Sequence, residues 1–308
     1  MMNRRNIRVK VFQSIYESQL QTETGQLELA LRSLDQKIQE TGSLLLASVH
    51  LLHLLSQYVL IYANQKASKH LATAEDRNVN IQLSRNVIIT RLASNKSLTD
   101  ELKKHKLSHL FEEEFIRTLF LKLIESREYQ EYIQIQTPTE ENDRTLVNYI
   151  VKALIFGDEL SVTFLSEHFQ CWYNDEEMVV SWFEKILQSP ATFRFNKLLS
   201  AEKLEFSRDL IKVYFDKKED VFQLIEPKLV NWDAERVAII DRILLHLGIC
   251  ELLYFPTIPV KVTINEYIDL AKQYSTLQSG NFVNGLLDNV HKELVQEKKL
   301  YKENYIRK

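Results

Sequence analysis

Apolar residues recur every three to four positions along most of the chain, which is the spacing of one face of an α-helix. Residues 4–20 are predicted to form a first helix, whose apolar face would hold Val9, Phe12, Ile15 and Tyr16. Thr22–Gly25 breaks the pattern and is expected to end this helix. A long second helix is predicted over about residues 27–63, which Thr41–Gly42 could interrupt.

Residues 43–63 are nearly all apolar and long enough to span a lipid bilayer. The stretch also carries His50 and His53, and it continues from the amphipathic residues 27–38 without a charged flank. We therefore favour a buried core helix over a membrane span, and expect no membrane partner. No carboxylate near the two histidines offers a third metal ligand, so both are predicted to be core residues.

The middle of the chain has a weaker pattern. Residues 66–80 are polar and predict a loop, whereas residues 81–92 are ambiguous. Residues 100–132 are predicted to be helical, with an apolar face of Leu107, Leu110, Phe111, Phe115, Leu119 and Leu123. Asn142–Asp143 offers a cap for a helix that follows.

The last third is densely patterned. Residues 236–254 are apolar over most of a helical circumference, which is typical of a helix at the centre of a bundle. Phe255–Pro259 is expected to end it. Thr263 and Glu266 have the spacing of a capping box, although that helix could begin a residue or two earlier. Ser279 is the predicted cap of the last helix, and the charged residues 298–308 are expected to fray.

Composition sharpens this picture. The 308 residues include only six Gly and five Pro, so we expect long elements and an all-α fold. The formal net charge of −3 means that any nucleic-acid contact must come from a local patch. Cys171 and Cys250 lie far apart, which fits a reducing cytoplasm and argues against a disulfide framework or zinc site. No signal peptide is visible, so a cytoplasmic location is expected.

Catalytic motifs are missing from the sequence. It contains no GxGxxG, no Walker A lysine, no GxSxG and no HExxH. We therefore expect a binding protein rather than an enzyme, with no cofactor and no metal.

Several segments occur in an order that is similar to one known family. The later ones are Asn231-Trp-Asp-x-Glu-Arg236, Ile240-Asp-Arg-Ile-Leu244, Glu251-Leu252, Pro259–Glu266, Ile268–Lys272 and Ser279–Asp288. At the other end stand Arg4-Arg5-x-x-Arg8 and Gln13-x-x-Tyr16. Together they resemble the NusB family of transcription antitermination factors.

The resemblance covers about residues 4–20 and 205–292. It implies a basic first helix in residues 1–20, a helical insertion of unknown role in residues 21–204, a helical core in residues 205–292 and a charged tail in residues 293–308. The implied fold is a pair of NusB-like helical bundles with an additional helical insertion. NusB-like domains also occur fused to ribosomal RNA methyltransferases, but the insertion has no Gly-rich cofactor loop and no βαβ rhythm.

The resemblance also implies a function. Members of the family bind boxA-type single-stranded RNA of ribosomal RNA leaders together with NusE, a small-subunit ribosomal protein. The complex joins the RNA polymerase elongation complex and suppresses premature termination. The rival hypothesis is a protein–protein scaffold that keeps the fold but has lost RNA affinity.

The first helix carries the best local evidence for RNA. Arg4, Arg5, Arg8 and Lys10 stand in its first turns, where the helix macrodipole disfavours cations by roughly 0.3–1 kcal/mol each. An anionic partner would explain them, and three or four phosphate contacts would give a slope of log K against log salt of roughly −2 to −3. The alternative is a solvated basic terminus.

The start of the last helix is the second candidate. Free backbone N–H groups near Ser279 could receive a phosphate. Phe282 matches a family aromatic that meets RNA, but it could equally belong to the core. Gln278 stands where the family usually has Asp and Asn281 where it usually has Lys, which weakens the expected grip on phosphate.

The resemblance places a protein-binding face elsewhere. Tyr16 matches a position near the NusE interface, and Asp241 and Arg242 match a charged pair on that side. The alternatives are an ordinary core tyrosine and a solvated charged face. His246 stands where Arg is common in the family, so a contact there could differ.

Overall fold

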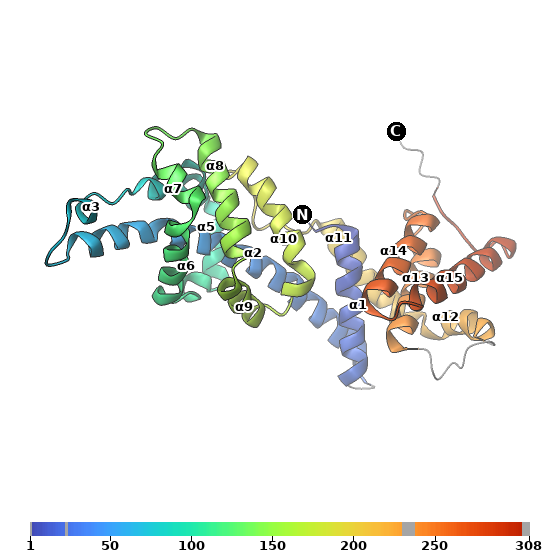
Figure 1. The fold of residues 1–308 in the computed structure, drawn as a ribbon. Helices are drawn as coiled ribbons and strands as arrows, with labels where there is room; N and C mark the ends of the chain where they lie inside the picture. Colours follow the sequence, from blue (N-terminus) through green and yellow to red (C-terminus); the bar gives the residue numbers. More distant parts are fainter. Residues whose placement is uncertain (1, 22–23, 230–237, 304–308) are drawn as a thin grey trace. The chain divides into compact units, whose positions relative to one another are not determined.

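The computed structural model describes residues 2–21, 24–229 and 238–303, and within these ranges it contains helices and no strand, which confirms the all-α prediction (Figure 1). The α-helices are α1 (Arg4–Gln21), α2 (Gln26–Ala67), α3 (Ala74–Arg77), α4 (Val87–Ala93), α5 (Lys96–Lys104), α6 (Glu113–Glu125), α7 (Arg127–Ile133), α8 (Glu140–Tyr149), α9 (Glu159–His168), α10 (Trp172–Gln188), α11 (Ala201–Asp216), α12 (Lys218–Ile225), α13 (Ile239–Tyr254), α14 (Val260–Tyr274) and α15 (Ser279–Gln296). Shorter turns are η1 (Gln82–Arg85), η2 (Leu107–His109), η4 (Glu226–Lys228) and the π-helical η3 (Ile150–Ile155).

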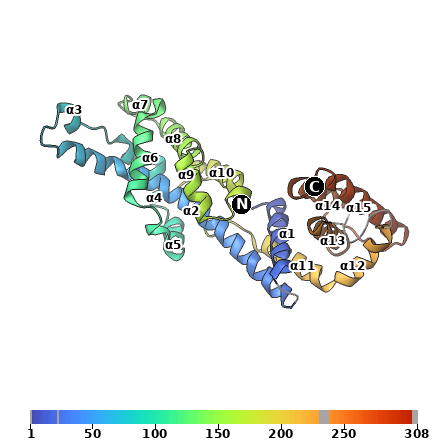
Figure 2. The same cartoon turned by 60° about the horizontal axis from the view of Figure 1, so that its bottom comes forward.

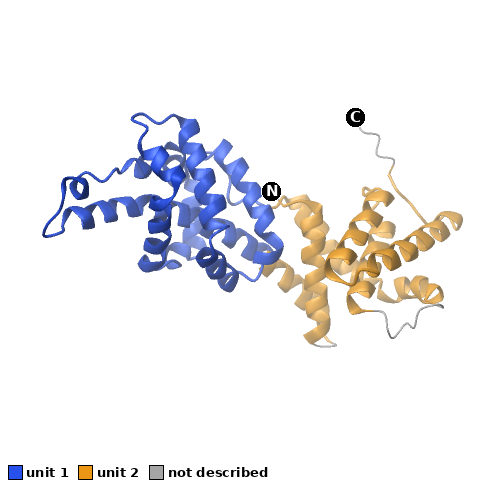
Figure 3. Ribbon diagram, viewed as in Figure 1, with its two compact units in different colours: residues 1, 38–198 blue, residues 2–37, 199–308 orange. Residues whose placement is uncertain are grey.

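The chain forms two compact units (Figure 3). Unit 1 consists of residues 38–198, and unit 2 consists of residues 2–37 and 199–308. Helix α2 contributes to both, since its residues 26–37 belong to unit 2 and the remainder to unit 1. Most of the proposed insertion, residues 21–204, is therefore unit 1.

Unit 2 is built around α13. This helix contacts α1, α11, α14 and α15, and α14 and α15 lie side by side in both views (Figures 1 and 2). Leu244, Leu247, Ile249 and Cys250 are fully buried, as the all-round apolar pattern of α13 predicts for a central helix. Gly25, with φ of +71°, supplies the left-handed turn between α1 and α2.

The first part of α2 is fixed to unit 2 by polar contacts. Ser33 Oγ donates to Glu17 Oε2 at 2.6 Å, and Lys37 Nζ donates to Glu17 Oε1 at 2.5 Å. Arg208 pairs with Asp35 at 2.8 Å. This part of the proposed insertion thus packs with α1 and α11 of unit 2.

The long apolar stretch of α2 lies in the core of unit 1. It is the one described helix that is long and apolar enough to cross a membrane, but Leu44, Leu51, Leu55 and Val59 are wholly buried by other helices. Gly42 does not interrupt the helix. The core-helix prediction is therefore confirmed.

Aromatic rings and one buried hydrogen bond join α2 to the rest of unit 1. Tyr58 and Tyr62 each place a ring centroid 5.3 Å from that of Phe120 on α6. Thr41 Oγ1 donates to the Asp175 carboxylate of α10 in a buried hydrogen bond. Unit 1 therefore has a core of its own.

The prediction of one continuous helix over residues 100–132 is wrong, because the structure breaks this range into α5, η2, α6 and α7. Lys106 adopts a left-handed conformation with φ of 55°, which ends α5 and starts the short turn η2. Ser126 is extended, and its side chain caps α7 by accepting from the N–H of Tyr129. Both breaks depend on local backbone geometry that apolar spacing does not report.

The predicted caps were partly wrong. Thr139 caps α8 in a capping box with Asn142, whereas Asp143 lies inside the helix. Thr263 lies inside α14, which begins after Pro259, and its hydroxyl is buried. Gln278 rather than Ser279 precedes the first helical residue of α15. The Asn231–Arg236 segment and the end of the tail, residues 304–308, lie outside the described residues.

Candidate nucleic-acid interface

Arg8 is the buried cation of unit 2. Its Nε donates to Glu251 Oε2 and its NH2 to Glu251 Oε1, both at 2.8 Å, and the two side chains are 1% and 0% exposed. Thr263 Oγ1 donates to the same carboxylate at 2.7 Å. The Tyr267 hydroxyl also donates to this carboxylate, at 3.3 Å. Bidentate geometry and added donors are what a buried ion pair requires.

Charge reinforces this pair. Burial by itself would lower the pKa of Arg8, but the hydrogen bonds and negative charge of Glu251 outweigh it and raise that pKa above its ordinary value. Lys10 is also buried, with 2% of its surface exposed. Neither Arg8 nor Lys10 is accessible from outside the protein, so of the four cations expected to contact phosphate, Arg4 and Arg5 are the ones that remain at the surface.

Arg4 and Arg5 lie at the surface of α1. Arg4 NH2 pairs with Glu202 Oε1 at 2.7 Å, and its guanidinium lies 5.7 Å from the centroid of the Phe206 ring. Arg5 NH1 pairs with Asp269 Oδ2 at 3.3 Å. These pairs are half-exposed, so each contributes about 0.2–1 kcal/mol and an incoming anion can displace the carboxylate.

The Arg5–Asp269 pair connects the two halves of the predicted RNA site. Asp269 lines a polar surface pocket of about 390 Å³ with Asn265, Lys272, Gly280, Asn281 and Asn284. Arg5 of α1 therefore lies beside the start of α15, although the two are far apart in sequence. We call Arg5, Asp269, Lys272, Asn281 and Asn284 the polar cluster.

Lys272 is the cation that sequence reasoning missed. Its stem lies over Gly280, where an added Cβ would stand 2.7 Å from the Lys272 Cγ atom. Within the described residues no ion pair to its ammonium occurs. Lys272 thus brings a positive charge to the neighbourhood of Asn281, where the family usually has Lys. The signal available in sequence was its helical spacing of three from Asp269.

The N-terminus of α15 offers fewer free donors than expected. The Ser279 N–H donates to the Thr276 carbonyl at 3.0 Å, and the Asn281 N–H donates to the Gln278 carbonyl at 3.1 Å. Phe282 is 8% exposed and belongs to the core, so the core alternative describes it. Gln278 and Asn281 remain at the surface.

Ser279 and Asp241 form a buried hydrogen bond. Ser279 Oγ donates to Asp241 Oδ2 at 2.8 Å, and both residues are buried. The contact joins the first turns of α13 and α15, and the carboxylate stands at a helix N-terminus, where the macrodipole favours it. This pair therefore positions the start of α15, rather than presenting an anion and a hydroxyl to a partner.

Tyr16 and Arg242 are the accessible members of the predicted partner face. Tyr16 is half-buried, and its ring centroid lies 6.2 Å from that of Phe12 on the same helix. Arg242 is exposed and lines a pocket of about 560 Å³ with Gln19, Tyr214, Lys218, Phe222 and His246. Burial lowers the pKa of His246 to about 4, so this side chain is neutral at pH 7.

The chemistry of the cluster suits anion binding and hydrogen bonding. Lys272, Asp269 and three asparagines line the polar pocket, and Arg5 pairs with Asp269 beside it. No group of three potential metal ligands occurs among the described residues. Amide side chains can donate to and accept from base edges or ribose hydroxyls. The arrangement lacks an exposed aromatic platform, since Phe282 is buried.

The comparisons with known proteins all indicate the same family. The family model described as "NusB family" matches residues 169–292. The transcription antitermination protein NusB of Carboxydothermus hydrogenoformans is 36% identical over 109 residues, covering 35% of this chain and 71% of that protein. The NusB of Myxococcus xanthus is 45% identical over 87 residues, covering 28% of this chain and 62% of that protein. The NusB of Fervidobacterium nodosum is 38% identical over 97 residues, covering 32% and 68%.

The similarity covers only part of this chain and only part of each relative. The chain spans about two thirds of the length of these relatives, and about one third of the chain is matched. A solved NusB structure from T. maritima is 32% identical, covers 42% of this chain and 86% of its own, and has a TM-score of 0.31.

Proposed function

The chain belongs to the NusB family, and on that premise we propose that it binds boxA-type single-stranded RNA together with NusE and couples that RNA to elongating RNA polymerase in the cytoplasm. Arg4, Arg5, Lys272 and Asn281 would contact the RNA. Tyr16 and Arg242 would contact NusE. The protein would act as a binding factor rather than as an enzyme.

The observation that carries this proposal is the Arg5–Asp269 contact. It brings the basic start of α1 to the polar pocket at the start of α15. Two segments that resemble the RNA-binding parts of the family thereby form one surface. Arg4 and Arg5 stand where the helix macrodipole disfavours cations, and their half-exposed ion pairs offset little of that cost, so an anionic partner would account for their position.

The electrostatic contribution follows from the cations that remain at the surface. Arg4, Arg5 and Lys272 allow two or three phosphate contacts, so the slope of log K against log salt should be about −1.4 to −2.1 for single-stranded RNA. This is shallower than the slope expected when Arg8 and Lys10 are included. Breaking the Arg4 and Arg5 ion pairs costs little, because both are half-exposed.

The test is fluorescence anisotropy with a labelled boxA-like RNA, with and without NusE. The intact chain is compared with an Arg5→Ala, Lys272→Ala variant. We expect tighter binding with NusE, a loss of roughly tenfold or more in the variant, and a salt slope that is smaller by about 1.4. Arg8 is left unchanged, because its loss would perturb the core.

A matched control removes two cations elsewhere. Arg127 and Lys152 are exposed residues of unit 1, and Arg127→Ala, Lys152→Ala has the same net charge as the test variant. Equal weakening in both variants would mean a non-specific charge effect. No binding by the folded protein, with or without NusE, would refute RNA recognition.

The scaffold alternative has one observation in its favour. Arg8 and Lys10 are buried, and Arg4 and Arg5 already pair with carboxylates. A NusB fold could keep all of these contacts without RNA. Binding of NusE with unchanged affinity in the presence and absence of RNA would support that alternative.

A further inference from the structure

Unit 1 carries a set of exposed cations that the proposed RNA function does not use. They come from α5 with the turn after it, and from the loop of residues 189–198 that follows α10. Within the described part of the chain, none of these side chains forms an ion pair. We call this set the basic face, which consists of Lys96, Lys103, Lys106, Arg194 and Lys197.

The loop is fixed to the start of α5 by hydrogen bonds. Asn95 is 3% exposed, and its Nδ2 donates to the carbonyl oxygens of Pro190 and Phe193, both at 2.9 Å. The N–H of Asn196 donates to Ser97 Oγ at 3.4 Å. The two cations of the loop therefore lie beside the first turn of α5, although about a hundred residues separate the two segments in sequence.

Helix α5 carries the other cations in a row. Lys96 and Lys103 are seven residues apart, which is close to two helical turns, so they share one side of the helix about 10 Å apart. Lys106 follows directly, since its N–H donates to the Lys103 carbonyl at 3.2 Å. The basic face is thus an extended row with two further cations at one end.

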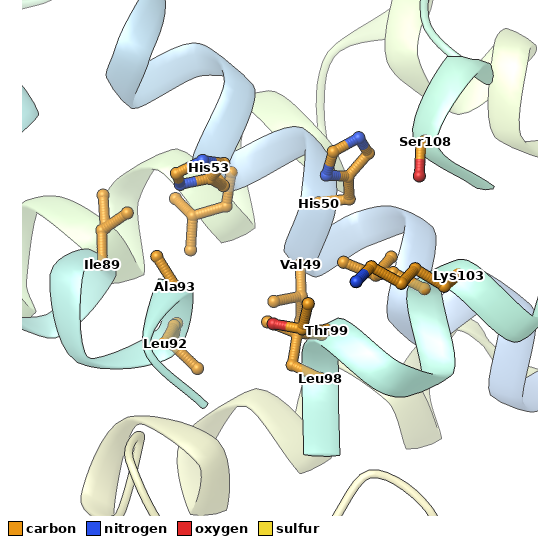
Figure 4. Close-up of a pocket in the computed structure, with 12 residues that line it drawn as sticks. Val49, His50, His53, Ile89, Leu92, Ala93, Leu98, Thr99, Lys103 and Ser108 are labelled. Carbon is orange, nitrogen blue, oxygen red and sulfur yellow. The ribbon is translucent and has the colours of Figure 1, made fainter. Parts of the chain in front are cut away.

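The apolar side of α5 fixes which residues face outward. Leu98 is 4% exposed and lines a cavity of about 200 Å³ together with Leu92 of α4 and Val49 of α2, as Figure 4 shows. Lys103 also lines this cavity but is exposed, so its stem covers apolar surface while the ammonium stays in water. The packing of unit 1 therefore holds the basic face at the surface.

Carboxylates on the two segments leave most of this charge in place. They are Asp100 and Glu101, of which Glu101 pairs with Lys104 at 3.3 Å and lies 3.4 Å from His105 Nε2. Asp100 thus opposes five cations. Lys96 is also the first residue of α5, where the macrodipole disfavours a cation. An anionic partner would offset both the dipole effect and the repulsion within the row.

The surroundings of the basic face favour one class of anionic partner. Among the described residues, none of the exposed large apolar side chains lies in residues 88–159 or 174–221. Protein interfaces and membrane-binding helices depend on such anchors, and proteins that bind single strands stack bases on aromatic rings. The basic face offers positive charge without any of these.

We propose that the basic face binds the phosphate backbone of a nucleic-acid double helix, irrespective of base sequence. A duplex carries one negative charge per about 1.7 Å of its axis and keeps its bases stacked inside, so it needs cations but no aromatic platform. DNA and RNA duplexes both present this chemistry. The proposal does not rest on boxA recognition, which concerns a single strand at unit 2.

The test is fluorescence anisotropy of the full chain with labelled duplexes of about 20 base pairs that lack a boxA sequence. Three to five phosphate contacts give a slope of log K against log salt of about −2.7 to −4.5. We expect a duplex to bind at least threefold more tightly than an oligo-U strand of the same length. A DNA duplex and an RNA duplex are compared, because a preference for one identifies the natural source and equal binding means that phosphates alone are recognised.

A charge-removing variant locates the contact. Lys96→Gln, Lys103→Gln, Lys197→Gln should lower duplex affinity at least tenfold at low salt and make the salt slope shallower by about 2.7. All three side chains are exposed, so the fold should be unchanged by circular dichroism. The converse variant is Asp100→Asn, which removes the opposing carboxylate and should tighten duplex binding severalfold.

Matched controls use exposed residues elsewhere in unit 1. Arg117→Gln, Arg127→Gln, Lys152→Gln removes the same charge from α6, α7 and η3 and should change duplex affinity much less. Glu128→Gln on α7 is the control for Asp100→Asn and should leave affinity unchanged.

The Arg5→Ala, Lys272→Ala variant should keep its duplex affinity while losing boxA binding. A failure of boxA recognition and a failure of duplex binding are therefore distinguishable.

Four results would overturn the proposal. The folded chain could show no duplex binding at low salt. The basic-face variant and its control could weaken binding equally, which would mean a non-specific charge effect. Oligo-U could bind as tightly as the duplex, which would assign the face to single strands. Polyglutamate of equal charge could displace the duplex completely, which would indicate an acidic protein as the partner.

Discussion

Replacing Arg8 by Met is expected to destabilise unit 2 by about 3–5 kcal/mol. The substitution keeps an apolar stem of similar length but removes the guanidinium, which makes two 2.8 Å hydrogen bonds to Glu251. Glu251 is wholly buried and would retain only the hydroxyl donors of Thr263 and Tyr267. The loss is large because a buried carboxylate would be left without its counter-charge.

The cost expected for losing the buried Arg8–Glu251 pair is larger than the cost of losing an ion pair at the surface. Arg5 stands three residues earlier on the same helix, but its pair with Asp269 is half-exposed and contributes about 0.2–1 kcal/mol. Arg5→Met is therefore the matched control. The same chemical change should cost several times more at Arg8 than at Arg5.

Hydrogen exchange followed by mass spectrometry measures this unit by unit. If α13 and α14 exchange through opening of unit 2, Arg8→Met should lower their protection by about 10²- to 10⁴-fold. Peptides from α6 and α10 in unit 1 provide an internal reference. A whole-chain denaturation curve is less suitable, because two units need not unfold in one transition.

A second substitution tests the cause. Adding Glu251→Gln to Arg8→Met removes the uncompensated charge while keeping an acceptor for Thr263 and Tyr267, so much of the protection should return. The reasoning is refuted if Arg8→Met costs no more than Arg5→Met, or if the double variant is less protected than Arg8→Met alone. Either result would mean that the pair does not hold α1 on α13.

Three further predictions concern single features. Burial lowers the pKa of His246 to about 4 from 6.5, so the folded chain binds fewer protons than the unfolded chain between these values. The free energy of opening unit 2 should therefore fall by about 2 kcal/mol from pH 7 to pH 5, as measured from the hydrogen exchange of α13, and His246→Gln should remove this part of the pH dependence; an unchanged dependence would exclude His246 as its source. Thr139→Ala removes the capping hydroxyl of α8 and should lower the protection of unit 1 in the same assay by about 1 kcal/mol, whereas Thr139→Ser should be nearly neutral. Gly280→Ala would collide with the Lys272 stem and displace it, so RNA affinity should drop towards that of Lys272→Ala; full affinity by anisotropy would show that the position of Lys272 is unimportant.

Much of the helical structure of this protein, and its family, could be predicted from sequence alone. The helical class, the first helix and a long second helix followed from apolar spacing and from the scarcity of Gly and Pro, whereas the continuity of that long helix through Gly42 was left open. The family followed from short segments in a set order. These features are local, because helical periodicity and sequence similarity are properties of neighbouring residues.

The distribution of the N-terminal cations was decided by tertiary structure. Arg4, Arg5, Arg8 and Lys10 look equivalent in sequence, but Arg8 and Lys10 are enclosed by the helices that pack on α1. The partner of Arg8 is Glu251, 243 residues away. No spacing rule reports a contact at that separation, and burial turns the same side chain from a phosphate ligand into the counter-charge of a core carboxylate.

The candidate sites show the same division. Sequence supplied Arg5, Asn281, His50 and His53 as residues of interest, but it could not place Arg5 beside Asp269 or assign a role to Lys272. It also could not show that two core histidines line a pocket, since a cavity exists only where α2, α4 and α5 fail to fill the space between them. The sequence determines the identity of each side chain. Which side chains are buried, which of them form ion pairs and where a cavity remains are decided only when helices distant in sequence pack together.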